Sequence, residues 1–125
     1  MQQETEEELS LQHHDLAEGE WGDIVVIKPN GAYILYKCEP NLKNLQHLVG
    51  GYIEVIPGFT KFNGFPSIVL GDEEGKLKNK PINTRATIEW TKAVGHAHRD
   101  MLVGDIIVLS GSAKEWFERD DDDVA

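Results

Sequence analysis

The sequence predicts an α+β fold: a single small mixed sheet of about five strands, with one or two short helices on one face. Segments rich in β-branched and aromatic residues recur along the chain between Gly, Pro and Asn, which is the pattern of short strands joined by turns. In the stretch from Asn41 to Gly58, apolar residues first recur every three to four positions and then at every second position. This change indicates a helix followed by a strand. A chain of 125 residues with 40% hydrophobic content suits one domain that buries a core without disulfides or metals.

The first predicted element is a β-hairpin. The segments "DIVVIK" and "AYILYK" have the composition of strands, and "PNGA" lies between them. Proline presets φ and Asn-Gly accepts positive φ, so this tetrapeptide suits a tight reversal.

A short amphipathic helix and a returning strand come next. Asn41 can accept hydrogen bonds from the free N–H groups at a helix start, and a Gly-Gly pair takes the left-handed cap at a helix end without steric cost. The alternating "YIEVI" then follows as a strand. We expect the helix to lie on the sheet as a crossover, right-handed if its flanking strands are parallel. The apolar stripe and the cap are formed by Leu42, Leu45, Leu48 or Val49, and Gly50 with Gly51.

Two further strands and a terminal helix complete the predicted domain. "FPSIVLG" and "GDIIVLS" are the strands. Ser112 and Glu115 have capping-box spacing, which predicts a short helix whose Trp116 or Phe117 docks on the core. No structure is assigned to residues 76–101.

The charge divides the chain into three parts. Residues 1–21 are predicted to be an acidic flexible arm, residues 22–119 the α+β domain, and residues 120–125 an acidic tail. The net charge is −10, but Met1 to Asp23 contain eight acidic residues and no Lys or Arg, whereas eleven bases and eight acids lie between Ile24 and Lys114. The domain is therefore mildly basic, and the acidic ends are typical of solvated tails.

The composition favours a cytoplasmic protein. The single cysteine, Cys38, cannot form an internal disulfide. No apolar run approaches the roughly 20 residues of a membrane span, and the N-terminus lacks the basic start and apolar middle of a secretion signal. We predict no membrane partner and no cofactor; if the protein is viral, its location is the host cytoplasm.

Two motifs carry a family resemblance. "NLKNLQHLVGGYIEV" and "DEEGKLKNKPINTRAT", within about Ile24 to Ser110, resemble an uncharacterised family of small domains of phages, mobile elements and large DNA viruses, domain of unknown function 3846. The resemblance implies a helix that leads through Gly-Gly into a strand, an acidic turn and a terminal Gly-Asp strand, and it implies no chemistry. The acidic ends and "TIEWTKAVGHAHRDM" depart from the family pattern. The matching residues are Gly50, Gly51, Tyr52, Glu54, Glu74, Gly75, Lys76, Leu77, Asn83 and Arg85.

The main candidate site is a basic strip beside aromatic residues. Three lysines would share one face of an extended segment, and an Asn and an Arg near them add hydrogen-bond donors suited to phosphate. The nearby loop "GFTKFNGF" offers phenylalanines that could stack on single-stranded bases. Of these phenylalanines, Phe62 is expected to be the most exposed. Alternatively, the lysines are a solvated edge that discourages aggregation, and the phenylalanines fill the end of the core. The candidate residues are Lys76, Lys78, Lys80, Asn83, Arg85 and Phe62.

Two weaker sites contain titratable residues. His96 and His98 alternate near Asp100, a spacing that suits zinc or copper, but nothing nearby completes a ligand shell, so we assign no metal there. Glu54 lies among apolar residues of a predicted strand, where a raised pKa would suit a general acid. The alternative is a carboxylate at the solvent face or paired with a lysine.

The leading functional hypothesis is a non-catalytic intracellular binding module of viral or phage type. It would contact nucleic acid or a phosphate-bearing ligand through the basic and aromatic face. No nucleophile is paired with a base, and no glycine-rich phosphate loop opens a helix, so we predict that the protein is not an enzyme.

Two alternatives belong to other classes. The first is an acidic inhibitor directed at a host protein, as a DNA mimic or host-interaction factor. The total charge favours it, but mimicry needs carboxylates on rigid elements and the acids lie in predicted tails. The second is a small metal-dependent hydrolase that uses His96, His98, and Glu54 or Asp100.

Overall fold

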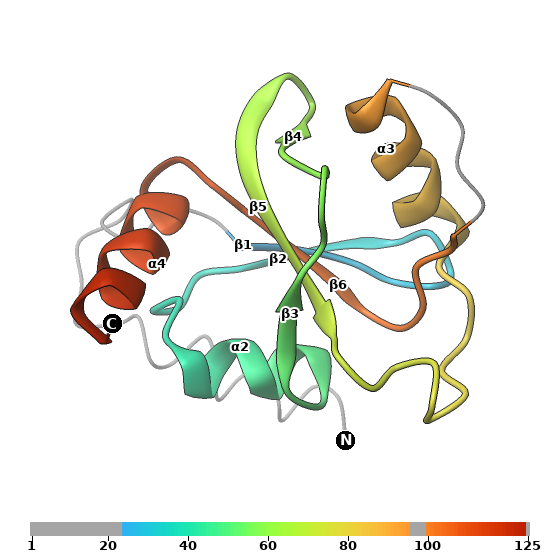
Figure 1. Cartoon of the computed structure of the whole chain (residues 1–125), viewed down its shortest axis with the longest axis horizontal. Helices are drawn as coiled ribbons and strands as arrows, with labels where there is room; N and C mark the ends of the chain where they lie inside the picture. Colours follow the sequence, from blue (N-terminus) through green and yellow to red (C-terminus); the bar gives the residue numbers. More distant parts are fainter. Residues whose placement is uncertain (1–23, 96–99, 125) are drawn as a thin grey trace.

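The computed structural model describes residues 24–95 and 100–124. The predicted acidic arm, residues 1–21, lies outside these ranges, as do His96 and His98. The elements, shown in Figure 1, are β1 (Ile24–Ile27), β2 (Tyr33–Tyr36), α2 (Leu42–Val49), β3 (Ile53–Val55), β4 (Lys61–Phe62), β5 (Phe65–Asp72), α3 (Thr84–Val94), β6 (Ile106–Ser110) and α4 (Gly111–Val124).

One antiparallel sheet organises the domain, and the predicted α+β class is confirmed. The strand order is β2-β1-β6-β5-β3, and β4 pairs with β5 in a short hairpin. The prediction of a mixed sheet is wrong, because every pairing between the described strands is antiparallel. The helix α2 does join two strands of the same direction, β2 and β3. These strands lie at opposite edges with three strands between them, so no parallel pair arises.

The predicted hairpin and helix are confirmed. The strands β1 and β2 pair with Ile27 opposite Tyr33, and Gly31 in the turn takes a φ of +91°. At the start of α2, the side chain of Asn41 accepts a hydrogen bond of 2.8 Å from the backbone N–H of Asn44. At its end, Gly50 takes the left-handed conformation at φ +80°, as the Gly-Gly pair predicts.

The helices cover both faces of the sheet. One core lies under α2 and α4, where Leu45 and Ala113 pack with Ile107 of β6. The other lies under α3, where Trp90 packs with Val108 of the same strand. The prediction of helices on a single face is wrong. The strand β6 is apolar and buried at four successive positions, and such a strand needs cover on both sides.

The two later helices differ from expectation. Helix α3 lies within residues 76–101, for which the sequence predicts no element. Helix α4 is 14 residues long and continues through residues 120–124, which were assigned to a tail. Its Phe117 packs against the core, as predicted. Within residues 24–95 and 100–124, no helix combines the length and apolar character needed to cross a membrane.

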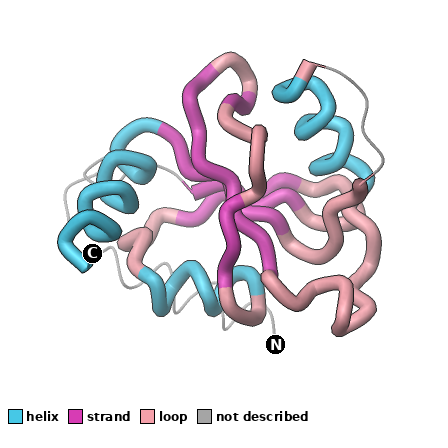
Figure 2. Tube along the Cα trace, in the orientation of Figure 1, coloured by secondary structure: helices cyan, strands magenta, loops and turns pink. Residues whose placement is uncertain are grey.

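Two loops meet beside the end of β5. Figure 2 shows them side by side: the turn-rich segment 73–83 after β5, and the segment 100–105 that leads into β6. A single antiparallel bridge joins Ile82 to Val103, and the N–H of Gly104 donates to the carbonyl of Pro81 over 2.8 Å. This junction contains most of the residues that the sequence singled out.

Candidate functional site

Two of the predicted cationic residues are bound to one buried carboxylate. Asp72 ends β5, and its side chain is only 1% exposed. Lys78 Nζ lies 2.8 Å and Lys80 Nζ 2.7 Å from the same carboxylate oxygen, and the N–H of Glu74 donates to the other oxygen over 2.9 Å. Burial raises the pKa of Asp72, but the hydrogen bonds from both lysines and from the Glu74 N–H outweigh it and hold this pKa at about 2. We call Asp72, Lys78 and Lys80 the carboxylate clamp.

The carboxylate clamp also ties the two family motifs together. Lys80 Nζ donates to the carbonyl of Val49 over 2.7 Å, and Lys78 Nζ to that of Gly50 over 3.2 Å, so both ammonium groups satisfy the last carbonyls of α2. A Cβ on Gly51 would lie 2.6 Å from Lys78 Nζ, so this position has no room for a side chain. The Gly-Gly and lysine-rich motifs are therefore explained by packing, and these lysines serve the fold.

Asn83 is the buried N-cap of α3. Its side-chain oxygen accepts from the N–H of Ala86 over 3.0 Å, and its amide donates to the carbonyls of Ile27 and Gly104, each over 2.8 Å. The residue is 0% exposed. All of its side-chain hydrogen-bonding groups thus join α3 to β1 and to the loop before β6, and none reaches the surface.

In the phenylalanine loop, residues 58–65, the buried and exposed phenylalanines differ from the prediction. Phe62 is only 7% exposed and packs in the core under α3, whereas Phe65 is 65% exposed. The expectation that Phe62 is the exposed member is therefore wrong. The two residues oppose each other across the β4–β5 hairpin, so composition alone did not distinguish them.

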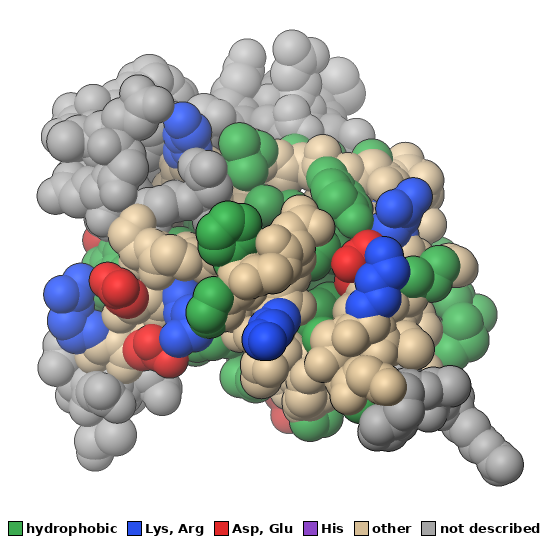
Figure 3. All heavy atoms as spheres, turned by 90° about the horizontal axis from the view of Figure 1, so that it is seen from above, with side chains coloured by type: hydrophobic (Ala, Val, Ile, Leu, Met, Phe, Trp, Pro, Cys, Tyr) green, Lys and Arg blue, Asp and Glu red, His purple; other side chains and the backbone are tan. Residues whose placement is uncertain are grey.

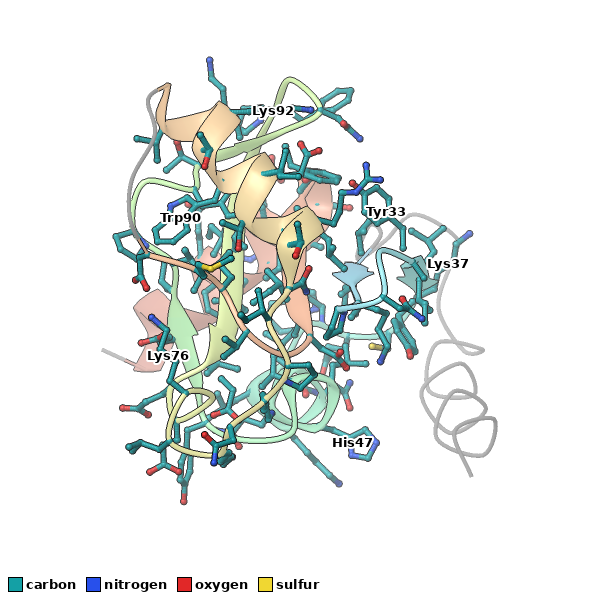
Figure 4. All side chains as sticks on the ribbon, turned by 90° about the vertical axis from the view of Figure 1, so that its right-hand side faces the viewer. Tyr33, Lys37, His47, Lys76, Trp90 and Lys92 are labelled. Atoms are coloured by element: carbon teal, nitrogen blue, oxygen red, sulfur yellow. The ribbon has the colours of Figure 1, made fainter. Side chains whose placement is uncertain are left out.

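The remaining lysine, Lys76, lies at a cavity of about 180 Å³. Its ammonium is paired with the carboxylate of Asp100, which joins the loop after β5 to the loop after α3. The lining includes Trp90 of α3, whose indole N–H donates to the carbonyl of Pro57 over 2.8 Å. Figure 4 shows Lys76 and Trp90 toward one side of the molecule and Tyr33 toward the other.

Glu54 lines the same cavity as Asp100. Its pKa is raised above the ordinary value, first by desolvation and then by the neighbouring negative charge of Glu73, while Lys76 acts in the opposite direction. The pKa shift thus has the predicted direction, and Glu54 is exposed, as in the alternative of a carboxylate at the solvent face. Among residues 24–95 and 100–124, no group of three or more His, Cys, Asp or Glu side chains is arranged to hold a metal ion.

Arg85 lies apart from the lysines, on an aromatic pair. Its guanidinium carbon is 5.9 Å from the centroid of the Tyr33 ring, a cation–π distance. Tyr33 in turn meets Phe62 edge to face, with ring centroids 5.7 Å apart. Tyr33 is 45% exposed and Arg85 is exposed at the start of α3. We call Tyr33, Phe62 and Arg85 the arginine–aromatic patch. Sequence reasoning missed Tyr33, although its outward position follows from the alternation of β2.

The predicted site residues therefore divide among four places. Lys78 and Lys80 are in the carboxylate clamp, Lys76 is at the cavity, and Arg85 is on the arginine–aromatic patch. Asn83 is in the interior. The lysine strip does not converge with Arg85 on one surface, because the buried Asp72 and the exposed Asp100 hold the lysines elsewhere.

Comparison with known proteins gives one family. The profile of a family described as a domain of unknown function (DUF3846) matches residues 22–123. Neither the curated proteins nor the solved structures contain a significant match to the chain.

Proposed function

The chain belongs to the DUF3846 family of domains of unknown function, and from that premise we propose that it is a non-catalytic binding module for nucleic acid or another phosphate-bearing ligand. The recognition surface in this proposal is the arginine–aromatic patch. The viral or phage setting implied by the sequence resemblance, with action inside a host cell, is part of the same proposal.

One observation carries the proposal: within residues 24–95 and 100–124, Arg85 is the one cation of the predicted strip that no carboxylate neutralises. Of the four cations in the predicted strip, the three lysines each pair with Asp72 or Asp100. Arg85 has no carboxylate partner among the described residues. A guanidinium presents a planar fork of donors that matches phosphate oxygens, and the ring below it restricts its movement.

The surroundings of the patch suit a single strand. Tyr33 offers a half-exposed ring for base stacking, which is tolerant of sequence. The neighbouring β4–β5 hairpin presents exposed Lys61 and Phe65. Figure 3, which views the molecule from above, shows basic, acidic and hydrophobic side chains interspersed on this side of the molecule. Basic groups interleaved with apolar ones are the composition of surfaces that follow a phosphate backbone and stack on bases.

Fluorescence anisotropy with labelled single-stranded oligonucleotides at two salt concentrations tests the proposal. We expect binding that weakens with salt, and an Arg85→Ala variant whose log–log salt slope is smaller by about 1. Tyr33→Ala should cost about 1–3 kcal/mol if a base stacks on the ring. Lys43→Ala, which alters an exposed lysine of α2 on the opposite face, is the matched control. Affinity that ignores salt and both substitutions contradicts the proposal.

A second candidate, the acidic inhibitor of a host protein, gains support from α4. The helix continues to Val124, so the backbone of the acidic run 120–123 is part of a regular element. Mimicry of nucleic acid needs acids on rigid elements, which a free tail does not supply.

Inhibition of restriction endonucleases, assayed by DNA cleavage, distinguishes this candidate. Replacing the four aspartates 120–123 by asparagine should abolish inhibition while Arg85→Ala preserves it. A full chain that inhibits no enzyme of the panel argues against the inhibitor.

A further inference from the structure

We propose that the cavity beside β3 and β5 binds a primary alkylammonium group, supplied by a small free amine or by the side chain of a lysine in a peptide. This site is separate from the arginine–aromatic patch and does not depend on the function proposed for it.

Two carboxylates without an ion-pair partner among the described residues, Glu54 and Glu73, line the cavity. Glu54 pairs with Gly71 across the β3–β5 ladder, and the N–H of Glu73 donates to the carbonyl of Tyr52 over 2.9 Å, so the same ladder continues beyond β5. Glu54 and Glu73 are therefore diagonal neighbours on one face, about 7–8 Å apart at their backbones. Both line the cavity, and neither has an ion-pair partner among the described residues. Like charges in this arrangement attract a cation placed between them.

The edge of the cavity already contains an alkylammonium group, the side chain of Lys76. Lys76 extends its own four-carbon chain there and pairs with Asp100. Its positive charge lowers the pKa of Glu54, which places it within electrostatic reach of that carboxylate. The chain thus shows an ammonium paired with one of the acids at this cavity, Asp100. One internal ammonium beside Glu54, Glu73 and Asp100 leaves the cavity mouth net negative.

The volume and the lining of the cavity suit a short alkyl chain that carries one charge. The inner lining is apolar, with Ile56 and Ile106 at the sheet and Trp90 and Leu102 beside them. Gly71 contributes no side chain on the sheet face that carries Glu54, because the two residues are paired. A volume of about 180 Å³ corresponds to roughly six water molecules at their share of liquid volume. A four-carbon ammonium, with five heavy atoms, fits this space with its methylenes on the apolar lining and its charge at the mouth.

An NMR titration of the full chain with n-butylammonium chloride tests the inference, and n-butanol is the neutral control. We expect saturable shifts of the Trp90 indole N–H and the Gly71 amide, with a dissociation constant on the order of 1–10 mM for so small a ligand. The alcohol should give shifts at least about fivefold weaker at equal concentration. Equal responses to both compounds, or no response at either group, overturn the proposal. A blocked lysine, N-acetyl-lysine N-methylamide, identifies the source: binding tighter than butylammonium indicates a peptide, and weaker binding a free amine.

Three substitutions should change the affinity for butylammonium, two of them downward and one upward. Glu54→Gln and Glu73→Gln should each weaken butylammonium binding about three- to fivefold, the range for a partly exposed charge pair. Lys76→Met removes the internal competitor and should strengthen binding by a similar factor. Glu115→Gln, on α4 against the other sheet face, should leave the affinity unchanged. If Lys76→Met weakens binding, or if Glu54→Gln and Glu115→Gln are equivalent, the acids do not form the proposed site.

Discussion

Replacing Asp72 by Asn is expected to lower the free energy of unfolding by about 2 kcal/mol at neutral pH, and by about half as much at pH 3. The carboxylate is almost wholly buried and is shared by two ammonium groups. Asparagine keeps the size and can still accept from the Glu74 N–H, so the substitution removes mainly the charge. The two lysines retain their contacts with the α2 carbonyls, which limits the loss.

The magnitude follows from the pKa of Asp72. A fall from the usual 3.8 to about 2 is worth about 2 kcal/mol, at 1.36 kcal/mol for each tenfold change in proton affinity. Because the folded-state pKa is the lower of the two, this stabilisation is complete above about pH 5 and is lost as the pH falls through 2. About half of it should remain at pH 3.

Urea denaturation followed by tryptophan fluorescence, at pH 7 and at pH 3, measures the difference between Asp72→Asn and the natural sequence. Glu74→Gln, an exposed carboxylate two residues away, is the matched control and should change the free energy of unfolding by less than about 0.5 kcal/mol. A difference for Asp72→Asn that is the same at both pH values refutes the reasoning, because it would then arise from packing and not from the charge.

Further expectations concern other buried groups. Gly51→Ala places a Cβ 2.8 Å from both carboxylate oxygens of Asp72 and 2.6 Å from Lys78 Nζ, and should cost about 1–3 kcal/mol in the same denaturation assay. Asn83→Ala removes a helix cap and the buried amide that donates to the carbonyls of Ile27 and Gly104, so a loss of about 3 kcal/mol and a lowered melting temperature are expected. The Cys38 thiol is fully buried and its pKa is raised to about 11, by burial first and by the charge of a neighbouring glutamate second. Alkylation of Cys38 at pH 8 should therefore be negligible in the folded protein and rapid in urea; fast labelling without urea contradicts the buried placement.

Local signals predicted the elements that depend on local chemistry. The β1–β2 hairpin follows from Asn-Gly, and α2 follows from its N-cap and its glycine end. Helix α3 was not predicted, although Ala86, Trp90, Ala93 and Val94 recur at helical spacing and pack on one core. Two of these four residues are alanines, and Ile88 lies exposed outside the stripe, so the apolar pattern is weak in the sequence. Asn83 is the sequence signal for the start of α3, because an Asn before a helical segment suits the N-cap. The prediction that Asn83 donates to phosphate overlooked this role.

The candidate site depended on contacts that are distant in the sequence. Nothing near Lys78 in the chain indicates that Val49 and Gly50 supply acceptors for it and for Lys80, because only the fold brings the end of α2 to this turn. The meeting of Glu54 with Asp100 likewise requires the loop after α3 to return to β3. The spacing of charged residues in the sequence shows which of them could form a site. The tertiary structure determines which of these residues remain without an ion-pair partner.

The strand order also governs when the protein can fold during its synthesis. Hairpin β1–β2 and the ladder β3–β5 touch no common strand except β6, which inserts between them and places Ile24 opposite Leu109. A nascent chain is made from its N-terminus, so both halves leave the ribosome before the segment that unites them. Until that late segment arrives, the strand edges that β6 pairs with in the finished sheet stay uncovered.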